Sequence, residues 1–189
     1  MDGGNLAVIM TGAVALVILS QVALILKCYH PARPGTALVR TGVGGPRVSF
    51  AGTIALPGLH QVERLDLAVR KIEVDCRGDR ALPCREGPHA GLQAAFLLGL
   101  AEDPAAVLQV TGALGCRRAS DPAALTDLFT PKFLAALQAA ARQRTVAELL
   151  ADPAAFQSEV ARAVAGDLLG FTLRDVAVHS IEATLPGRV

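Results

Sequence analysis

Residues 6–26 read LAVIMTGAVALVILSQVALIL, a stretch of 21 residues without a charged side chain. As a helix it would span about 30 Å, the hydrocarbon thickness of a bilayer. Twelve of its residues are Leu, Ile or Val, and together they favour the membrane by about 4–7 kcal/mol. These residues are Leu6, Val8, Ile9, Val14, Leu16, Val17, Ile18, Leu19, Val22, Leu24, Ile25 and Leu26. The stretch therefore predicts a transmembrane helix, and we assign residues 1–28 to an N-terminal membrane anchor.

The residues on either side of this stretch indicate that the helix is retained and how it is oriented. A cleaved signal peptide has a basic region before its apolar core and a site of small residues after it. Residues 1–5 contain neither Lys nor Arg, and residues 27–31 offer no such site. All the basic residues near the stretch follow it, no acid appears on that side before Glu63, and the N-terminal side has only Asp2. By the positive-inside rule we expect a single-pass protein of the cell membrane with its body in the cytoplasm.

The segment after the anchor combines positive charge with apolar side chains. Residues 27–62 contain four basic residues and no acidic one, and each charge near an anionic bilayer contributes about 1 kcal/mol. We expect contact with the membrane surface from Lys27, Arg33, Arg40, Arg47 and Phe50. Cys28 lies two residues beyond the apolar run, a position where S-acylation occurs. It is therefore either a candidate acylation site or a plain thiol at the interface.

The composition of the chain excludes several classes of function. The chain has 189 residues, a formal net charge of +1 and only 4% aromatic residues. Nucleic-acid binding calls for a basic surface or for aromatic stacking platforms, so we expect no nucleic-acid partner. The four cysteines show no zinc-site spacing, and in the cytoplasm they should be free thiols. Cys76 and Cys84 flank a turn and could also face each other. We expect no metal and no cofactor.

Short strands and turns are predicted for residues 29–100, and helices for most of residues 101–189. The strand candidates are residues 36–40, 47–50, 53–56, 61–66, 68–76 and 90–100, and the last is an apolar run typical of a buried central strand. Gly78-Asp79 predicts a hairpin tip. Helix starts are predicted at Asp103-Pro104, Asp121-Pro122, Thr145 and Asp152-Pro153, and Pro131 should kink or split the second helix. A final strand from Phe171 to about residue 185 completes an α+β body.

The candidate catalytic groups have simpler structural interpretations. Residues 42–45 contain three glycines but lack the Lys-Ser/Thr of a phosphate-binding loop, so they predict a β-turn. Ser120-Asp121 is interpreted as a helix cap and His179 as a residue on a strand face, rather than as parts of a hydrolase triad. The apolar stripe of residues 125–137 is core or, less favoured, a partner groove. We therefore expect that the protein is not an enzyme.

Several stretches of the sequence carry a resemblance to a known family. They are residues 29–30, 34–37, 39–45, 56–57, 60–67, 71–74, 115–116, 118–122, 167–168 and 175–177. Together they resemble the flotillin branch of the SPFH (band 7) family. The resemblance implies a β-rich SPFH1 subdomain over residues 29–100 and an α/β SPFH2 subdomain over residues 101–189, rich in helices and ending in a strand. It also implies large oligomers that scaffold membrane microdomains, without an enzyme activity.

The resemblance further implies the partners of the protein. They are the lipid bilayer, other copies of the chain or a full-length flotillin-like protein, and an NfeD-type membrane protein. Flotillins continue into a long coiled coil, whereas this sequence stops at Val189, so we expect weak self-association. The leading hypothesis is a membrane-anchored scaffold module. The alternatives are a short adaptor that joins or caps assemblies of a full-length flotillin and, less favoured, a membrane-tethered hydrolase or protease regulator.

Overall fold

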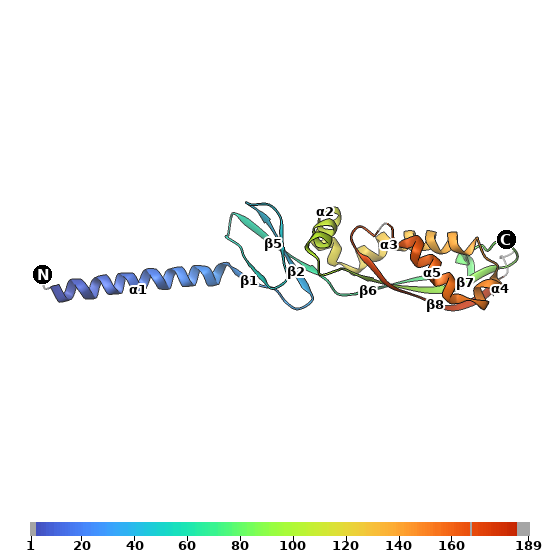
Figure 1. Ribbon diagram of the computed structural model, residues 1–189, viewed down its shortest axis with the longest axis horizontal. Helices are drawn as coiled ribbons and strands as arrows, with labels where there is room; N and C mark the ends of the chain where they lie inside the picture. Colours follow the sequence, from blue (N-terminus) through green and yellow to red (C-terminus); the bar gives the residue numbers. More distant parts are fainter. Residues whose placement is uncertain (1–2, 167, 185–189) are drawn as a thin grey trace. The chain divides into compact units, whose positions relative to one another are not determined.

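The computed structural model describes residues 3–166 and 168–184, with side chains from residue 10 onward except that of Thr184. The side chains of Leu6, Val8 and Ile9, which belong to the predicted anchor, and Leu185 in the predicted last strand lie outside the described part. The contacts divide the chain into two compact units, Met1–Arg64 and Leu65–Val189 (Figure 1). Each unit is described by itself below.

The first unit joins a long helix to two small sheets. The helix α1 (Gly3–Cys28) passes directly into strand β1 (Tyr29–Pro31). Strand β1 pairs antiparallel with β4 (Gly52–Ile54). The second sheet has the order β3-β2-β5, from β2 (Thr36–Gly42), β3 (Arg47–Ser49) and β5 (His60–Asp66). The strands predicted for this region are thus confirmed within a few residues.

The second unit is built on one three-stranded antiparallel sheet covered by helices. The sheet has the order β6-β7-β8, from β6 (Arg70–Cys76), β7 (His89–Gly99) and β8 (Thr172–Thr184). Strand β7 is central and almost wholly buried, which confirms the buried central strand predicted at residues 90–100. The four helices are α2 (Pro104–Ser120), α3 (Pro122–Ala141), α4 (Val146–Ala151) and α5 (Pro153–Val164).

Each of these helices begins at the residue that the sequence predicts. Asp103, Asp121 and Asp152 accept a hydrogen bond from a main-chain N–H of the helix that follows them, and Pro occupies the first helical position each time. Thr145 and Glu148 form a complete capping box at α4. These caps act over three or four residues, so the sequence alone was sufficient to locate them.

An aromatic cluster fixes the helices to the sheet. The rings of Phe96 on β7 and Phe133 on α3 stack with their centroids 4.1 Å apart, and Phe129 packs edge-on to Phe171 at 5.8 Å. Leu125 and Leu137, at the ends of the same helical stripe, are also buried. The stripe predicted over residues 125–137 is therefore core rather than a partner groove.

Two predicted breaks are absent from their expected places. Helix α3 runs without a break through Pro131, because Phe129 and Phe133 bury both halves on one face and outweigh the hydrogen bond that Pro cannot donate. The helical backbone is interrupted instead at Gly115 in α2, where φ is +76°. Gly78-Asp79 is not a hairpin tip. It begins a short 3₁₀ helix, Gly78–Arg80, in the long connection between β6 and β7.

The division of contacts also falls elsewhere than the subdomain boundary predicted at residues 100–101. It lies between Arg64 and Leu65, because β6 and β7 share a sheet with β8 from the end of the chain. The predicted boundary followed the change from strand to helix pattern. That change cannot reveal a pairing between strands that are more than 70 residues apart in sequence.

Candidate membrane interface

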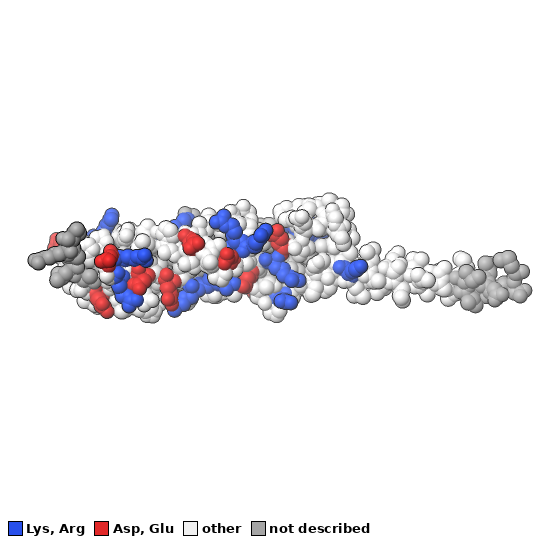
Figure 2. Space-filling model, turned by 180° about the vertical axis from the view of Figure 1, so that it is seen from behind, with Lys and Arg blue, Asp and Glu red and all other residues white. Residues whose placement is uncertain are grey.

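Helix α1 has the length and the composition of a membrane-spanning segment. Residues Met10–Cys28 have a mean hydropathy of 2.0 and little of this span is buried. Its predicted anchor side chains from Val14 to Leu26 are exposed on all sides of the helix. Figure 2 shows this part of the helix free of charge up to a basic group near its end. A helix that is apolar all round and not packed in a protein core belongs in a bilayer.

The end of α1 is hydrogen-bonded to the first sheet and buried there, and we call this connection the closed joint. The carbonyl oxygen of Cys28 accepts a hydrogen bond from the Ala55 N–H at 2.9 Å and another from His30 Nδ1 at 3.1 Å. The Cys28 side chain is only 2% exposed. Acylation of this thiol therefore requires the joint to open first.

Strand β4 carries exposed apolar residues back to the level of the helix end. It runs antiparallel to β1, so that Ile54 lies opposite Tyr29 and Ala55 reaches Cys28. Residues 56–60 then form a turn, in which the Leu56 carbonyl oxygen accepts the Leu59 and His60 N–H groups at 3.2 and 3.0 Å. The exposed apolar residues of this region are between 43% and 67% exposed, and we call them the base patch: Tyr29, Val43, Ile54, Leu56 and Leu59.

His60 hydrogen-bonds to both turns that carry base-patch residues, residues 42–45 and 56–59. His60 Nδ1 accepts the Leu56 N–H at 3.2 Å, and its Nε2 lies 3.1 Å from the Val43 carbonyl oxygen. Because a carbonyl can only accept, Nε2 carries the proton. At Gly42 an added Cβ would lie 2.2 Å from the Leu59 carbonyl oxygen, and φ is +127°. Only glycine permits this approach, and the Gly45 N–H bond to the Gly42 carbonyl confirms the predicted β-turn.

The basic residues of this unit have no acidic partners among the residues that the structure describes. Lys27, Arg33 and Arg47 are exposed, and Arg40 donates from Nη1 to the Ile54 carbonyl oxygen at 3.0 Å. Arg40 and Arg47 lie directly opposite each other on β2 and β3. Like charges in this position destabilise a sheet, whereas an anionic surface beside them would relieve the repulsion.

The sequence predicts only part of this set of exposed residues. The four predicted basic residues lie in the first unit, while Phe50 is half-buried and offers less surface than expected. Tyr29, Val43 and Leu59 were missed as apolar contacts. An aromatic residue directly after an apolar run, as Tyr29 is, is a signal for the bilayer interface. Val43 and Leu59 come together only through the fold.

The other candidate sites have structural roles. The Ser120 hydroxyl accepts the Asp66 N–H at 3.1 Å, and Asp121 caps α3. His179 is exposed on β8. None of the four cysteines forms a disulfide, and burial raises the pKa of the Cys76 thiol to about 11. Within the described residues, no group of three His, Cys, Asp or Glu side chains could hold a metal.

Comparison with known proteins matches residues 30–184 to the SPFH domain / Band 7 family. The match begins two residues after the end of α1. The flotillin family inner membrane protein sll1021 of Synechocystis sp. is 28% identical over 176 residues, which are 90% of this chain and 26% of that protein. The flotillin family inner membrane protein YqiK of Escherichia coli is 29% identical over 178 residues, which are 92% of this chain and 32% of that protein. The chain thus spans about a quarter to a third of the length of these relatives.

Proposed function

This chain belongs to the SPFH domain / Band 7 family, and we propose that it is a membrane-anchored scaffold module that organises membrane microdomains through assembly of this domain. The observation that carries the proposal is the closed joint. An apolar helix long enough to span a bilayer passes into the family domain through the buried Cys28. Relatives named as flotillin family inner membrane proteins support a place in the cell membrane.

The base patch and its basic neighbours suit a bilayer surface. Tyr29 directly follows α1 and Ile54 lies opposite it, and insertion of the exposed apolar side chains into the interfacial region would remove them from water. Lys27, Arg33, Arg40 and Arg47 would each gain about 1 kcal/mol from anionic headgroups. With these charges on the cytoplasmic side, the positive-inside rule places the body in the cytoplasm.

Scaffolding requires neighbouring copies to associate within the membrane. Anchoring confines the chains to two dimensions and raises their effective concentration, so that weak contacts suffice. We propose that the partners are other copies of this chain, a full-length flotillin-like protein and an NfeD-type membrane protein. In detergent, where this confinement is lost, the chain should run as a monomer or a small oligomer.

Membrane binding is tested with residues 30–189 and lipid vesicles. Binding should be stronger to anionic than to neutral vesicles, and it should weaken on anionic vesicles when Arg40→Glu and Arg47→Glu are combined. Arg117→Glu with Arg118→Glu, two exposed positions on α2, is the matched control and should bind as the unchanged chain does. Equal absence of binding to both vesicle types would refute the surface contact.

Orientation and assembly need the full chain in a bacterial membrane. Phosphatase fused after Val189 should be inactive and a fluorescent protein at the same position should fluoresce; the reverse would place the body outside the cytoplasm. A lysine-reactive crosslinker should link neighbouring copies. Linkage that appears only when a full-length relative is expressed beside this chain would assign the adaptor function instead.

A further inference from the structure

The sheet of the second unit ends in two edge strands. Strands β6 and β8 each pair with β7 on one side, and no other strand of the described residues pairs with either of them. An edge strand presents main-chain N–H and C=O groups that can pair with another chain. Strand β8 is 13 residues long, which is much longer than the short edge strands by which proteins avoid such pairing.

The register of the sheet places opposite charges on its two edges. On the face away from the helices, Lys71 lies opposite Leu97, which lies opposite Asp175. In the same way Asp75 shares a row with His179 through Gln93. These edge side chains are exposed, and the central residues between them are uncharged.

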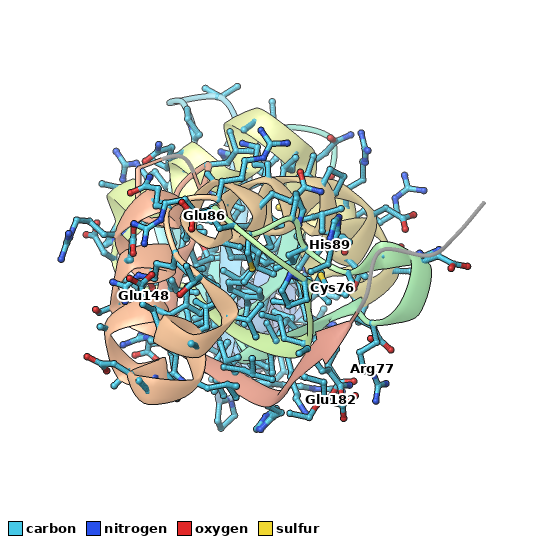
Figure 3. The ribbon with its side chains drawn as sticks, turned by 90° about the vertical axis from the view of Figure 1, so that its right-hand side faces the viewer. Cys76, Arg77, Glu86, His89, Glu148 and Glu182 are labelled. Carbon is cyan, nitrogen blue, oxygen red and sulfur yellow. The ribbon has the colours of Figure 1, made fainter. Side chains whose placement is uncertain are left out.

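The last row repeats the pattern. Glu182 lies opposite Gly91, and Arg77 follows Cys76, which lies opposite Leu92. Arg77 therefore continues β6 toward the row of Glu182, and Figure 3 shows both side chains at the same side of the molecule. The pKa of Arg77 is raised, mainly by its hydrogen bond to Asp75 and to a smaller extent by the charge of Glu182. The two edges thus carry opposite charges in the first and the last row.

This complementarity is stronger between copies than within one chain. Strands in a sheet are spaced by about 4.8 Å, so the two edges of a three-stranded sheet lie roughly 10 Å apart. If a second sheet were placed beside the first, the same pairs would become direct neighbours, at half that distance. The attraction between two charges rises as their separation falls.

We propose that β8 of one copy pairs with β6 of the next copy, row by row, so that the sheets of neighbouring copies join head to tail. The inference rests on the self-assembly in the proposed function and names its interface. Strands β6 and β8 are both antiparallel to β7, so the new pairing is parallel. Copies anchored in one bilayer face the same way, which permits repeated head-to-tail contacts that close into a ring or extend along the membrane.

The charged side chains of the two edges have exchangeable partners in the single chain. In the single chain Asp175 Oδ1 accepts the Val176 N–H at 2.9 Å, and Lys71 pairs with Glu73 at 2.5 Å. Exposed interactions of this kind are easily exchanged for others, so Asp175 and Lys71 of neighbouring copies can turn to each other.

Charge reversal separates an interface between copies from an attraction within one chain. Lys71→Glu with Arg77→Glu reverses β6, and Asp175→Lys with Glu182→Lys reverses β8. Either pair alone should lower the association of full chains in vesicles about tenfold, as two like-charge contacts would, measured by energy transfer between fluorescent proteins fused after Val189. When the two variants are mixed, each reversed edge can meet a reversed partner edge and each unchanged edge an unchanged one, so opposite charges face each other again and association should return. Arg117→Glu with Arg118→Glu should have no effect.

A disulfide tests the register independently. Glu73 shares a row with Ala177 through Ala95, and within one chain the two lie two strand spacings apart, beyond the reach of a disulfide. Full chains with Glu73→Cys, mixed with chains with Ala177→Cys in a Cys84→Ser background, should form linked dimers under mild oxidation. Glu73→Cys mixed with Glu182→Cys, several rows away, should not.

The outcomes distinguish this inference from the proposed function. If lysine crosslinking reports neighbours but mixing restores nothing and no disulfide forms, the chain assembles through another surface and the inference is overturned. Rescue by combining all four reversals in one chain, but not by mixing, would assign the charges to the single sheet and overturn it as well. If unchanged chains show no neighbours at all, the assembly in the proposed function fails.

Discussion

Ser180 holds a backbone conformation that suits glycine. Its φ is +43°, at the bulge where β8 has one more residue than β7 between the pairs Gly91–Glu182 and Gln93–His179. A side chain in this left-handed region costs about 1 kcal/mol. We predict that Ser180→Gly raises the free energy of unfolding by about 1 kcal/mol in urea titrations. The same change at Ser158 in helix α5 should lower it, since glycine weakens helices. A loss of stability at Ser180 would contradict the strain.

Single residues also show the limits of sequence reasoning. The helix caps at Asp103 and Asp152 were predicted because their hydrogen bonds reach only three residues along the chain. The burial of Cys28 was not, because it depends on a strand that begins 24 residues later. Exposure of a side chain next to a membrane anchor is thus decided by tertiary pairing rather than by its neighbours in sequence.

At the scale of elements, the capping box of α4 makes the helix sensitive to acid. The hydrogen bond from the Thr145 N–H, assisted by the charge of Arg85, holds the pKa of Glu148 below its ordinary value of 4.5. A lowered folded pKa contributes stability that is present above pH 4.5 and is lost as the pH falls through the folded pKa. We predict that Glu148→Gln removes this part of the acid sensitivity, measured as hydrogen exchange of the α4 amides between pH 7 and pH 3.

The matched control for this helix is Thr145→Ala. It removes the hydroxyl that accepts the Glu148 N–H but leaves the Thr145 N–H in place. It should therefore lower stability by about 1 kcal/mol at neutral pH and keep most of the acid sensitivity, because the main-chain N–H is the largest cause of the lowered pKa and the hydroxyl a smaller one. If both variants change the pH dependence alike, the carboxylate has no separate role.

The paired turns of the base patch depend on one glycine. We predict that Gly42→Ala lowers the free energy of unfolding by about 3 kcal/mol, because the new methyl group would strike the Leu59 carbonyl and φ is unfavourable. Gly44→Ala also has a positive φ but meets open space, so its cost should be clearly smaller. Thermal unfolding of the two variants side by side measures the difference, and equal losses would show that φ alone matters.

Elements were easier to predict than their partners. Helices α2 to α5 and the central strand β7 followed from caps and periodicity. The sheet order β6-β7-β8 did not, because a strand pattern says nothing about which strand lies beside it. For the same reason the sequence predicts a tight hairpin at Gly78-Asp79 where the structure has a long β6–β7 connection, and the contacts divide the chain before β6 rather than after β7.

At the scale of the whole molecule, the second unit should fold without the first. Residues 65–189 contain the complete sheet β6-β7-β8, its helices and the aromatic cluster. We predict that this fragment is soluble and unfolds cooperatively, with a midpoint within a few degrees of the corresponding transition of the full chain. Circular dichroism and differential scanning calorimetry test this. A fragment without cooperative unfolding would show that the first unit is needed for the second.

The closed joint at Cys28 also has a mechanical consequence. A membrane helix that is too long for its bilayer relieves the mismatch by tilting, and a flexible linker would normally absorb that tilt. Here the last carbonyl of the helix accepts the N–H of Ala55, directly after β4, so we expect the first sheet to turn together with α1. The tilt of α1, which depends on bilayer thickness, would then set the orientation of this sheet relative to the membrane. That orientation would differ between thin and thick regions of one membrane.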